Sequence, residues 1–380
     1  MRDGPNCTEA PYSWVIDHVV PTTETLRDLA IGLGAAAFGV TTAEPFPEAL
    51  VTLRAHRASG MSGPLHFTYD EPVVASNVEM TFPWARSIVV FAHNYLSDAI
   101  TPANTGAVVG RFATSDHYQS VRRIAERLAG LVVDAGHRAE PLIDDNRLVD
   151  RAAAARAGLG WIGKSTMVLT PGHGPWMLLG SLVTDIGLET TRPMIRDCGT
   201  CDACIPACPT GAITASGLDA SKCISTWLQT PGSIPRWIRP YIGRRIYGCD
   251  DCLTSCPPGQ RTLVNMSSSP TPLDFDGLLA TDDDRLLDQF SWWYVPRRDP
   301  RYIRRNILIA AGNSGEAAAL PAIRDHMSHR SSMIRSHAVW ALARSRGSDA
   351  RGDLEDALAR EAVPETIEEI EFALGMIEAD

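Results

Sequence analysis

Two cysteine-rich runs decide the fold: residues 198–209 read CGTCDACIPACP and residues 249–257 read CDDCLTSCP. The first run has the spacing C-x2-C-x2-C-x3-C-P, the second repeats C-x2-C-x3-C-P, and Cys223 lies between them. The first spacing is that of bacterial two-cluster ferredoxins, in which the fourth cysteine ligates the other cluster. Together the runs predict a ferredoxin-like module with two [4Fe–4S] clusters.

The eight cysteines of this stretch divide into two sets of four. We assign to one cluster the first three cysteines of the first run and the last cysteine of the second, Cys198, Cys201, Cys204 and Cys256. We assign to the other cluster Cys208, Cys223, Cys249 and Cys252. A pair of zinc sites or a disulfide framework is the alternative, but neither needs the interleaved run. The ninth cysteine, Cys7, is expected to be a free thiol.

The bulk composition is that of an ordinary globular protein. The chain has 380 residues, enough for two or three domains, with 44% hydrophobic and 21% charged residues. Eight of its nine cysteines fall within 59 residues, which argues against a secreted, disulfide-stapled chain and for a reducing cytoplasm. The start has no signal-peptide pattern, and no apolar run reaches the ~18 residues that span a membrane. We therefore expect no membrane association.

Charge is distributed unevenly along the chain. The net charge is −10, yet residues 289–346 hold ten arginines against three acids, and residues 351–380 hold ten acids against two arginines. Residues 234–248 add four arginines interleaved with Trp237, Tyr241 and Tyr247. Basic and aromatic residues together can bind a nucleic acid. The alternatives are solvated helix faces and aromatic packing over the clusters.

Apolar periodicity predicts the secondary structure. In the N-terminal part it predicts helices from Thr23 to Gly34 and over 46–60, 115–136 and 147–157, and strands over 38–41, 86–95, 141–143, 165–170 and 176–183. Residues 265–274 read as a linker, and the chain from 301 onward reads as helical hairpins of a short HEAT-type solenoid. The predicted units are an α/β (α+β) domain over 1–186, the cluster module over 187–264, a linker and connecting segment over 265–300, and helical repeats over 301–380.

The loop GLGWIGKS, residues 158–165, satisfies the string of a phosphate-binding P-loop. A P-loop follows a strand and opens a helix, whereas this loop follows a predicted helix and opens a predicted strand. The sequence therefore argues against nucleotide binding. Lys164 in this loop and Lys222 are the two lysines among 35 basic residues.

Over nearly its whole length the chain resembles epoxyqueuosine reductase, the cobalamin- and iron–sulfur-dependent family of tRNA queuosine biosynthesis. The resemblance is strongest in AAAARAGLGWIGKSTMVL, WMLLGSLVTD, CGTCDACIPACPTGAI, KCISTW, IGRRIYGCDDCLTSCP and RSHAVWALARS. Reductive dehalogenases are similar in the cobalamin fold and the paired clusters but end at the clusters.

The resemblance implies a base-off cobalamin between the N-terminal domain and a cluster. By position in the family's pattern, Asp144 faces cobalt and substrate, Ser225 and Asp250 contact the cobalamin, and Val168 and Leu179 wall the corrin. The implied partners are a tRNA anticodon stem–loop and an electron donor, and the protein is expected to be a monomer.

The implied reaction removes the epoxide oxygen with two electrons and releases water. The departing oxygen needs a proton, and a carboxyl near a flat apolar cofactor would have a raised pKa. Asp144 is the predicted catalytic acid. A purely structural role is the alternative, since Asp144 or Asp145 could cap the 147–157 helix.

The chain departs from the family's pattern on the substrate side. The usual D-T-[GA]-P is Asp144-Asp145-Asn146-Arg147, D-Y-H is Asp116-His117-Tyr118, and C-P-W-N is Cys256-Pro257-Pro258-Gly259. Three functions therefore stay open: reduction of epoxyqueuosine in tRNA, cobalamin-dependent reduction of a small molecule, and electron transfer without catalysis.

Overall fold

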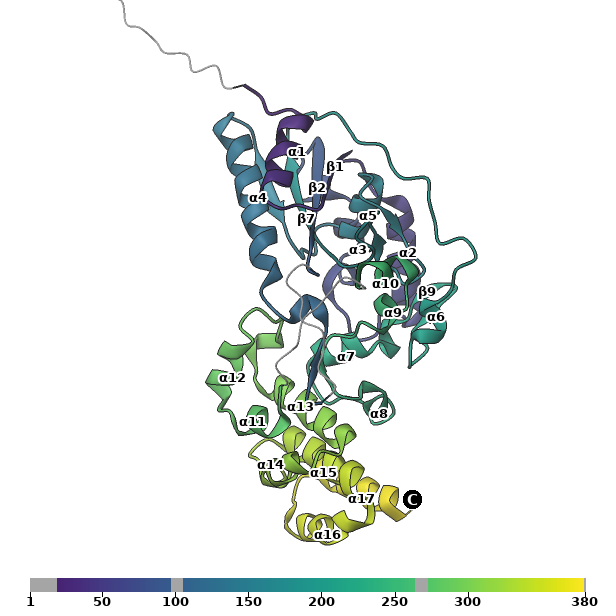
Figure 1. Cartoon of the computed structure of the whole chain (residues 1–380), viewed down its shortest axis with the longest axis vertical. Helices are drawn as coiled ribbons and strands as arrows, with labels where there is room; N and C mark the ends of the chain where they lie inside the picture. The colour runs from purple at the N-terminus through teal and green to yellow at the C-terminus, as the bar shows by residue number, and fades with distance from the viewer. Residues whose placement is uncertain (1–18, 97–104, 264–272, 379–380) are drawn as a thin grey trace, which may run out of the picture.

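The computed structural model describes residues 19–96, 105–263 and 273–378. Cys7 lies outside these ranges. The molecule is elongated, with a mixed α/β unit at one end, a small irregular module in the middle and a helical arm at the other end (Figure 1). Within the described ranges no helix is both long and apolar enough to cross a bilayer.

The α/β unit is built on a four-stranded sheet with the order β1-β2-β7-β4, in which all neighbours are antiparallel. The strands are β1 (Ala37–Thr42), β2 (Ser87–Asn94), β7 (Met177–Thr184) and β4 (Ala139–Leu142). Strand β2 is buried along nearly all its length because helices cover both faces of the sheet. This explains why the sequence shows a continuous apolar run there.

Successive side chains of β2 enter opposite cores. Val89 and Phe91 pack with α1 (Thr23–Gly32) and α4 (His117–Asp134) on one face. Ile88 and Val90 pack with α5 (Asp150–Arg156) on the other face. The same side carries α2 (Pro47–Ser59) and α3 (Pro72–Ala75), so the unit has three layers.

One helix and one strand of the α/β unit differ from the elements predicted from the sequence. Helix α5 begins at Asp150 rather than 147, because residues 144–148 form a charged turn. The strand predicted over 165–170 is reduced to β6 (Val168–Leu169), which pairs with β5 (Trp161–Ile162). The backbone turns at Thr166, where φ is +64°, and Gly163 N donates to the Met167 carbonyl. The string GLGWIGKS thus enters a hairpin, and no helix follows it as in a P-loop.

The middle module consists of short elements wrapped around the cysteines. They are α6 (Cys204–Ala207), β8 (Ile213–Thr214), β9 (Gly217–Leu218), α7 (Ile224–Gln229), α8 (Arg239–Ile242), β10 (Arg245–Tyr247), α9 (Asp251–Thr254) and α10 (Pro257–Leu263). Strand β3 (Val108–Val109) from the N-terminal part pairs in parallel with β10. Trp176 Nε1 donates to the Gly259 carbonyl at 3.0 Å. These contacts tie the α/β unit to the module.

The arm is a stack of helices that continues the core of the module. It contains α13 (Arg301–Ser314), α14 (Leu320–His326), α15 (Ser332–Arg346), α16 (Arg351–Arg360) and α17 (Pro364–Glu378). Helices α13 and α15 touch at Gly312, where a Cβ would lie only 2.6 Å from Ala341 Cα. The described part of the predicted linker, from 273, holds α11 (Phe275–Ala280) and α12 (Asp283–Gln289). Phe275 and Leu278 share one core with Ile307 and Ile246. The predicted domain boundaries remain predictions.

Short 3-10 turns complete the described structure. They are η1 (Phe67–Tyr69), η2 (Val78–Met80), η3 (Arg111–Ala113), η4 (Ala220–Lys222), η5 (Pro296–Arg298), η6 (Ala317–Ala319) and η7 (Gly347–Ala350).

Candidate functional site

The eight cysteines of the module are unbridged and form two electrostatic groups. Burial raises the pKa of Cys204, and its neighbouring thiols Cys198, Cys201 and Cys256 raise it further. Burial also raises the pKa of Cys252, with Cys249, Cys223 and Cys208 as the thiols that add to this effect. The two groups have the same members as the two predicted ligand sets. The assignment of ligands to clusters stays a prediction, which this grouping supports.

The two sets differ in their surroundings. We call Cys198, Cys201, Cys204 and Cys256 the outer set, because Cys201 is exposed. We call Cys208, Cys223, Cys249 and Cys252 the inner set. Burial raises the pKa of Cys249 to about 12, although Arg245 beside it lowers the value. Within the described residues no three His, Cys, Asp or Glu side chains are close enough to hold a single metal ion. The four thiolates of a [4Fe–4S] cluster each bind a different iron, so their sulfur atoms lie farther apart than those of four ligands on one ion. The absence of a single-ion site from the described part of the chain is therefore compatible with the cluster assignment.

A pocket of ≈ 480 Å³ is lined by residues of the α/β unit, the module and the connecting segment before the arm. Its lining is mainly aromatic and acidic, with Phe112, Ala113, Tyr118, Arg122, Pro141, Ile143, Asp144, Asp145, Gln229, Tyr247, Trp292, Trp293 and Tyr294. The Tyr247 and Trp293 rings stack with centroids 4.3 Å apart. Trp292 Nε1 and Trp293 Nε1 both donate to the Ala113 carbonyl, at 2.9 and 2.8 Å. The stacked rings and fixed indoles give this pocket a rigid wall.

Asp144 occupies this pocket on the turn after β4. Its φ is +51°, a left-handed conformation that Asp tolerates better than most residues. Desolvation raises the pKa of Asp144, the nearby Asp150 adds to the rise, and Arg151 opposes it. The side chain of Asp144 is nevertheless accessible to solvent. It lies on the wall of an open pocket, where protein atoms surround it on several sides and water reaches it from the pocket. A ligand that covered the pocket would raise the pKa further.

The remainder of the turn is fastened to the sheet by Arg147. Its Nε and Nη2 bond both carboxylate oxygens of Asp145, at 2.9 and 2.7 Å, and Nη2 also lies 3.2 Å from Glu140 Oε1 on β4. The guanidinium sits over the Phe82 ring, 5.1 Å from its centroid. The charge of Arg147 is therefore neutralised by Asp145 and Glu140, and the turn is held against β4.

The suggestion that Asp144 or Asp145 caps the following helix is wrong. The N-cap of α5 is Val149, which makes no side-chain cap, and Asp145 bonds Arg147 instead. Among the described residues the Asp144 carboxyl makes no hydrogen bond or ion pair, a property that suits a group that has to exchange a proton.

Asp250 and Ser225, the two predicted cobalamin contacts of the module, lie beside the inner set. Asp250 Oδ2 accepts from Arg111 N at 2.8 Å and from Arg111 Nη1 at 3.3 Å. Desolvation raises the pKa of Asp250, and these bonds to Arg111 oppose the rise. Ser225 Oγ accepts from Gln229 Nε2 at 3.0 Å, and Gln229 Oε1 lies 3.2 Å from Tyr247 Oη. Ser225 is thus connected through Gln229 to the pocket that holds Asp144.

The two predicted corrin-wall residues are apolar core residues in the structure. Val168 is buried on β6, and Leu179 on β7 is partly buried against the same core. Their role toward cobalamin stays a prediction.

The sequence analysis missed the aromatic wall. Trp292, Trp293 and Tyr294 adjoin one another in the sequence and lie in the segment that we read as a connector. Three adjacent aromatic residues in an otherwise polar connector could have predicted a buried wall or a binding surface there. Tyr118 was noted only as part of a swapped motif, yet it lines the pocket; burial raises its pKa, and Asp144 adds to the rise.

The predicted basic surface is smaller than the charge count suggests. Arginines of the 289–346 segment bond acids of the tail, Arg324 to Asp353 at 2.8 Å and Arg335 to Glu361 at 2.6 Å. Arg236 and Arg239 both reach Glu369 on α17. These arginines are therefore neutralised in part by acids of neighbouring helices, while the choice between a nucleic-acid surface and solvated helix faces stays a prediction.

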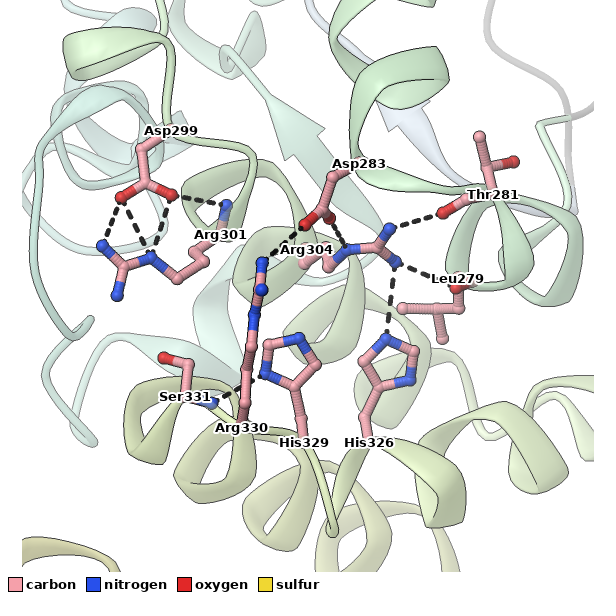
Figure 2. A network of polar contacts seen from close by, with 10 residues as sticks. All are labelled: Leu279, Thr281, Asp283, Asp299, Arg301, Arg304, His326, His329, Arg330 and Ser331. Atoms are coloured by element: carbon pink, nitrogen blue, oxygen red, sulfur yellow. Dashed lines mark hydrogen bonds and ion pairs between the residues drawn. The ribbon is translucent and has the colours of Figure 1, made fainter.

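Figure 2 shows a second group of neutralised arginines, where α12, α13 and α14 meet. Arg304 Nε donates to Asp283 at 2.7 Å and its Nη atoms donate to the Leu279 and Thr281 carbonyls. Arg297 and Arg298 are exposed and follow the aromatic wall after Val295 and Pro296, and Arg298 donates to the Ser291 and Leu287 carbonyls. Tyr247 packs inside, whereas Trp237 and Tyr241 are each 48% exposed.

Taken together, the thiol groups, the pocket and the stacked helices define an iron–sulfur protein with a HEAT-repeat arm. Residues 197–259 match the family described as "4Fe-4S double cluster binding domain", and residues 295–375 match "HEAT repeats".

Comparison of the whole chain identifies the family. The epoxyqueuosine reductase of Bacillus subtilis (strain 168) is 31% identical over 95% of this chain and 97% of its own length. The enzyme of Staphylococcus aureus is 30% identical over 86% and 90%. A crystal structure of epoxyqueuosine reductase with an epoxyqueuosine-modified tRNA-Tyr stem loop superimposes with a TM-score of 0.83 at 30% identity, covering 93% of this chain and 98% of that one. The chain belongs to the epoxyqueuosine reductase family, whose members are oxidoreductases.

Proposed function

We propose that this protein reduces epoxyqueuosine to queuosine at the wobble position of tRNA. Family membership over nearly the full length supports the reaction. The observation that supports a site for it is the exposed carboxyl of Asp144, which has no partner among the described residues and lies in an aromatic pocket. The reaction consumes two electrons and two protons per epoxide and gives an alkene and water.

The pocket suits a cobalamin by its chemistry. Stacked rings on one wall fit a flat macrocycle, and Gln229 of the same lining offers an amide group to the amide side chains of a corrin. Ser225, which bonds Gln229, offers a hydroxyl, and Asp250 offers a carboxylate from a second pocket that it lines with Arg111 and Cys249. We infer that Ser225, Asp250 and the neighbouring Gln229 would hold a base-off cobalamin, with Val168 and Leu179 behind it. Such a cofactor supplies a low-valent cobalt, able to pass to the epoxide the electrons that the two clusters deliver singly.

Within this arrangement Asp144 is the proton donor. A raised pKa lets the carboxyl hold its proton until the epoxide oxygen leaves. The clamp of Asp145, Arg147 and Glu140 keeps the turn against β4 while Asp144 itself stays unbonded. Burial raises the pKa of Tyr118 and of Tyr247, so both hydroxyls stay neutral. The Tyr247 hydroxyl faces the Gln229 side-chain oxygen and the Tyr294 carbonyl, whereas the Tyr118 hydroxyl can donate to the substrate.

The decisive experiment is anaerobic turnover of an anticodon stem–loop carrying epoxyqueuosine. The reconstituted protein, with cobalamin and dithionite, should give a product lighter by one oxygen atom in mass spectrometry. Absence of conversion in a protein shown by spectroscopy to hold clusters and cobalamin would overturn the proposal.

A small-molecule substrate is the second candidate, and the ion pairing of the arm favours it. Arginines such as Arg324 and Arg335 are neutralised within the fold and cannot all face phosphates. The salt dependence of substrate affinity separates the two functions. An enzyme acting on tRNA should lose affinity as salt rises, with a log–log slope of about −0.7 for each phosphate neutralised on a single strand, whereas one acting on a free base should not.

A further inference from the structure

We propose that the surface around Cys201 is the docking site of a one-electron carrier protein with an acidic rim. The inference rests on the double-cluster module and is independent of the proposed substrate. We define the entry surface by Ile162, Lys164, Met194, Ile195, Arg196 and Cys201.

The first observation is the asymmetry of the two thiol sets. Cys201 of the outer set is exposed, whereas none of the other seven described cysteines is. Cys249 and Cys252 of the inner set lie deep enough for burial to dominate their electrostatics, next to Asp250 and Arg245. A carrier protein can therefore approach the outer set more closely than the inner set.

The second observation is that two separate segments build this surface together. A Cβ on Gly163 would lie 3.4 Å from Cys198 Sγ, so the hairpin loop after β5 rests against the outer set. Lys164 Nζ donates to the Gly199 carbonyl at 3.1 Å, and the Arg196 guanidinium lies 4.4 Å from the Trp161 ring centroid. These contacts place the residues next to them, Ile162 and Ile195, on the same side of the outer set.

The third observation is that the surface carries apolar side chains that its own chain leaves uncovered. Ile195 is fully exposed, and Ile162 and Met194 are 46% and 37% exposed. Exposed apolar groups beside polar ones mark interaction sites. Electron-transfer partners associate through interfaces smaller than those of stable complexes, below about 1,200 Å². A patch of three apolar residues at a cluster ligand fits an encounter of that kind.

Charge selects the partner. Lys164 and Arg196 are the charged side chains of the entry surface, and Asp197 and Asp202 flank it in the sequence. Asp197 Oδ1 accepts from Gly199 N at 2.7 Å and is thereby turned toward its own backbone. The two basic side chains of the surface favour a carrier with acidic residues around its redox group. Each encounter would transfer one electron from the reduced carrier to the outer cluster, so that two encounters serve one two-electron reduction.

The test measures cluster reduction in the absence of any substrate. Holoprotein with both clusters is mixed anaerobically with a reduced acidic flavodoxin, and the loss of cluster absorbance is followed by stopped flow. The same protein is then mixed with dithionite, which needs no docking surface. The double variant Met194→Asp/Ile195→Asp should be reduced about tenfold more slowly by flavodoxin and at an unchanged rate by dithionite. Val133→Asp, at an exposed position on α4, should leave both rates unchanged.

Lys164→Glu provides a second test that does not depend on the apolar residues. It should slow reduction by flavodoxin severalfold at low salt, and the difference should shrink as salt screens the charge. An unchanged flavodoxin rate in both variants would overturn the proposal. Equal slowing with flavodoxin and dithionite would overturn it too, because the surface would then not discriminate between a docked carrier and a small reductant. Since no epoxide is present, failure here is distinct from failure of the proposed function.

Discussion

Two turns of this protein carry an aspartate from the end of a strand toward the interior, and they treat it in opposite ways. Asp250 follows β10 and is held by the backbone and guanidinium of Arg111. Asp144 follows β4 and has no such partner, while its neighbour Asp145 takes the arginine of the turn. Burial raises the pKa of both carboxyls. The two carboxyls differ in hydrogen bonding and in access to solvent: Asp250 is bonded and its side chain is 11% exposed, whereas Asp144 is unbonded among the described residues and reaches the open pocket. This difference separates a carboxyl that fixes structure from one that can transfer a proton.

The largest effect is expected from replacing the carboxyl of Asp144. Asp144→Asn should lower turnover by about 10²–10⁴-fold, the usual contribution of a general acid. Thermal unfolding should change little, because the carboxyl bonds no described residue. Steady-state turnover of the stem–loop, together with the melting temperature of the variant, checks both parts. Near-normal turnover would leave Asp144 without a catalytic role.

Replacing Arg111, the partner of Asp250, should mainly lower the free energy of unfolding. Arg111→Met leaves a buried carboxylate uncompensated, which typically costs ~3–5 kcal/mol. Denaturant unfolding of the variant measures this cost. The double variant Arg111→Met/Asp250→Asn should recover much of the loss, since no charge stays unpaired. Equal stability of the two variants would mean that Asp250 is not held by this pair.

The pH dependence sharpens the contrast further. A raised pKa means that the folded state prefers protonated Asp144, so kcat/KM should be highest at low pH and fall about tenfold per pH unit above that pKa. The decline should begin above the ordinary range of an aspartate. For stability the sign is the same: the contribution of Asp144 is fully present below its unfolded pKa and is lost as pH rises through the folded value. Unfolding of Asp144→Asn across this range should lack that loss.

The smallest effect is expected at the clamp. Arg147→Ala frees the turn from β4 without touching the carboxyl of Asp144, so kcat should fall roughly tenfold, the size of loss that misplacement of a reacting group produces. Because the protonating group is unchanged, the pKa in the pH profile should shift little and KM should stay nearly constant. Arg147→Lys, which keeps one ionic contact, should recover part of kcat. Loss through KM instead would indicate that Arg147 binds substrate.

The sequence predicted those parts of the molecule that local rules govern. The cysteine spacing gave the module, the apolar run 86–95 gave β2, and the helical hairpins from 301 gave the repeat arm. It failed where long-range pairing decides. Residues 147–149 read as helix but turn because Arg147 bonds Asp145 and Glu140. The charge count of the arginine-rich segment left a nucleic-acid surface and solvated helix faces both open, because it could not show that Arg335 pairs with Glu361.

Ion pairs from Arg236 and Arg239 link the last helix to the module, and the pair of Arg239 is the buried one. Arg239, 2% exposed, meets Glu369 of α17 at 2.7 Å, and burial lowers the pKa of its guanidinium. A chain that stopped before α17 would leave this charge without its counterion, at a cost of ~3–5 kcal/mol. The stability of the module therefore depends on the last helix of the chain, which lies farthest from it in the sequence. A chain truncated before α17 should unfold at a lower denaturant concentration than the full chain.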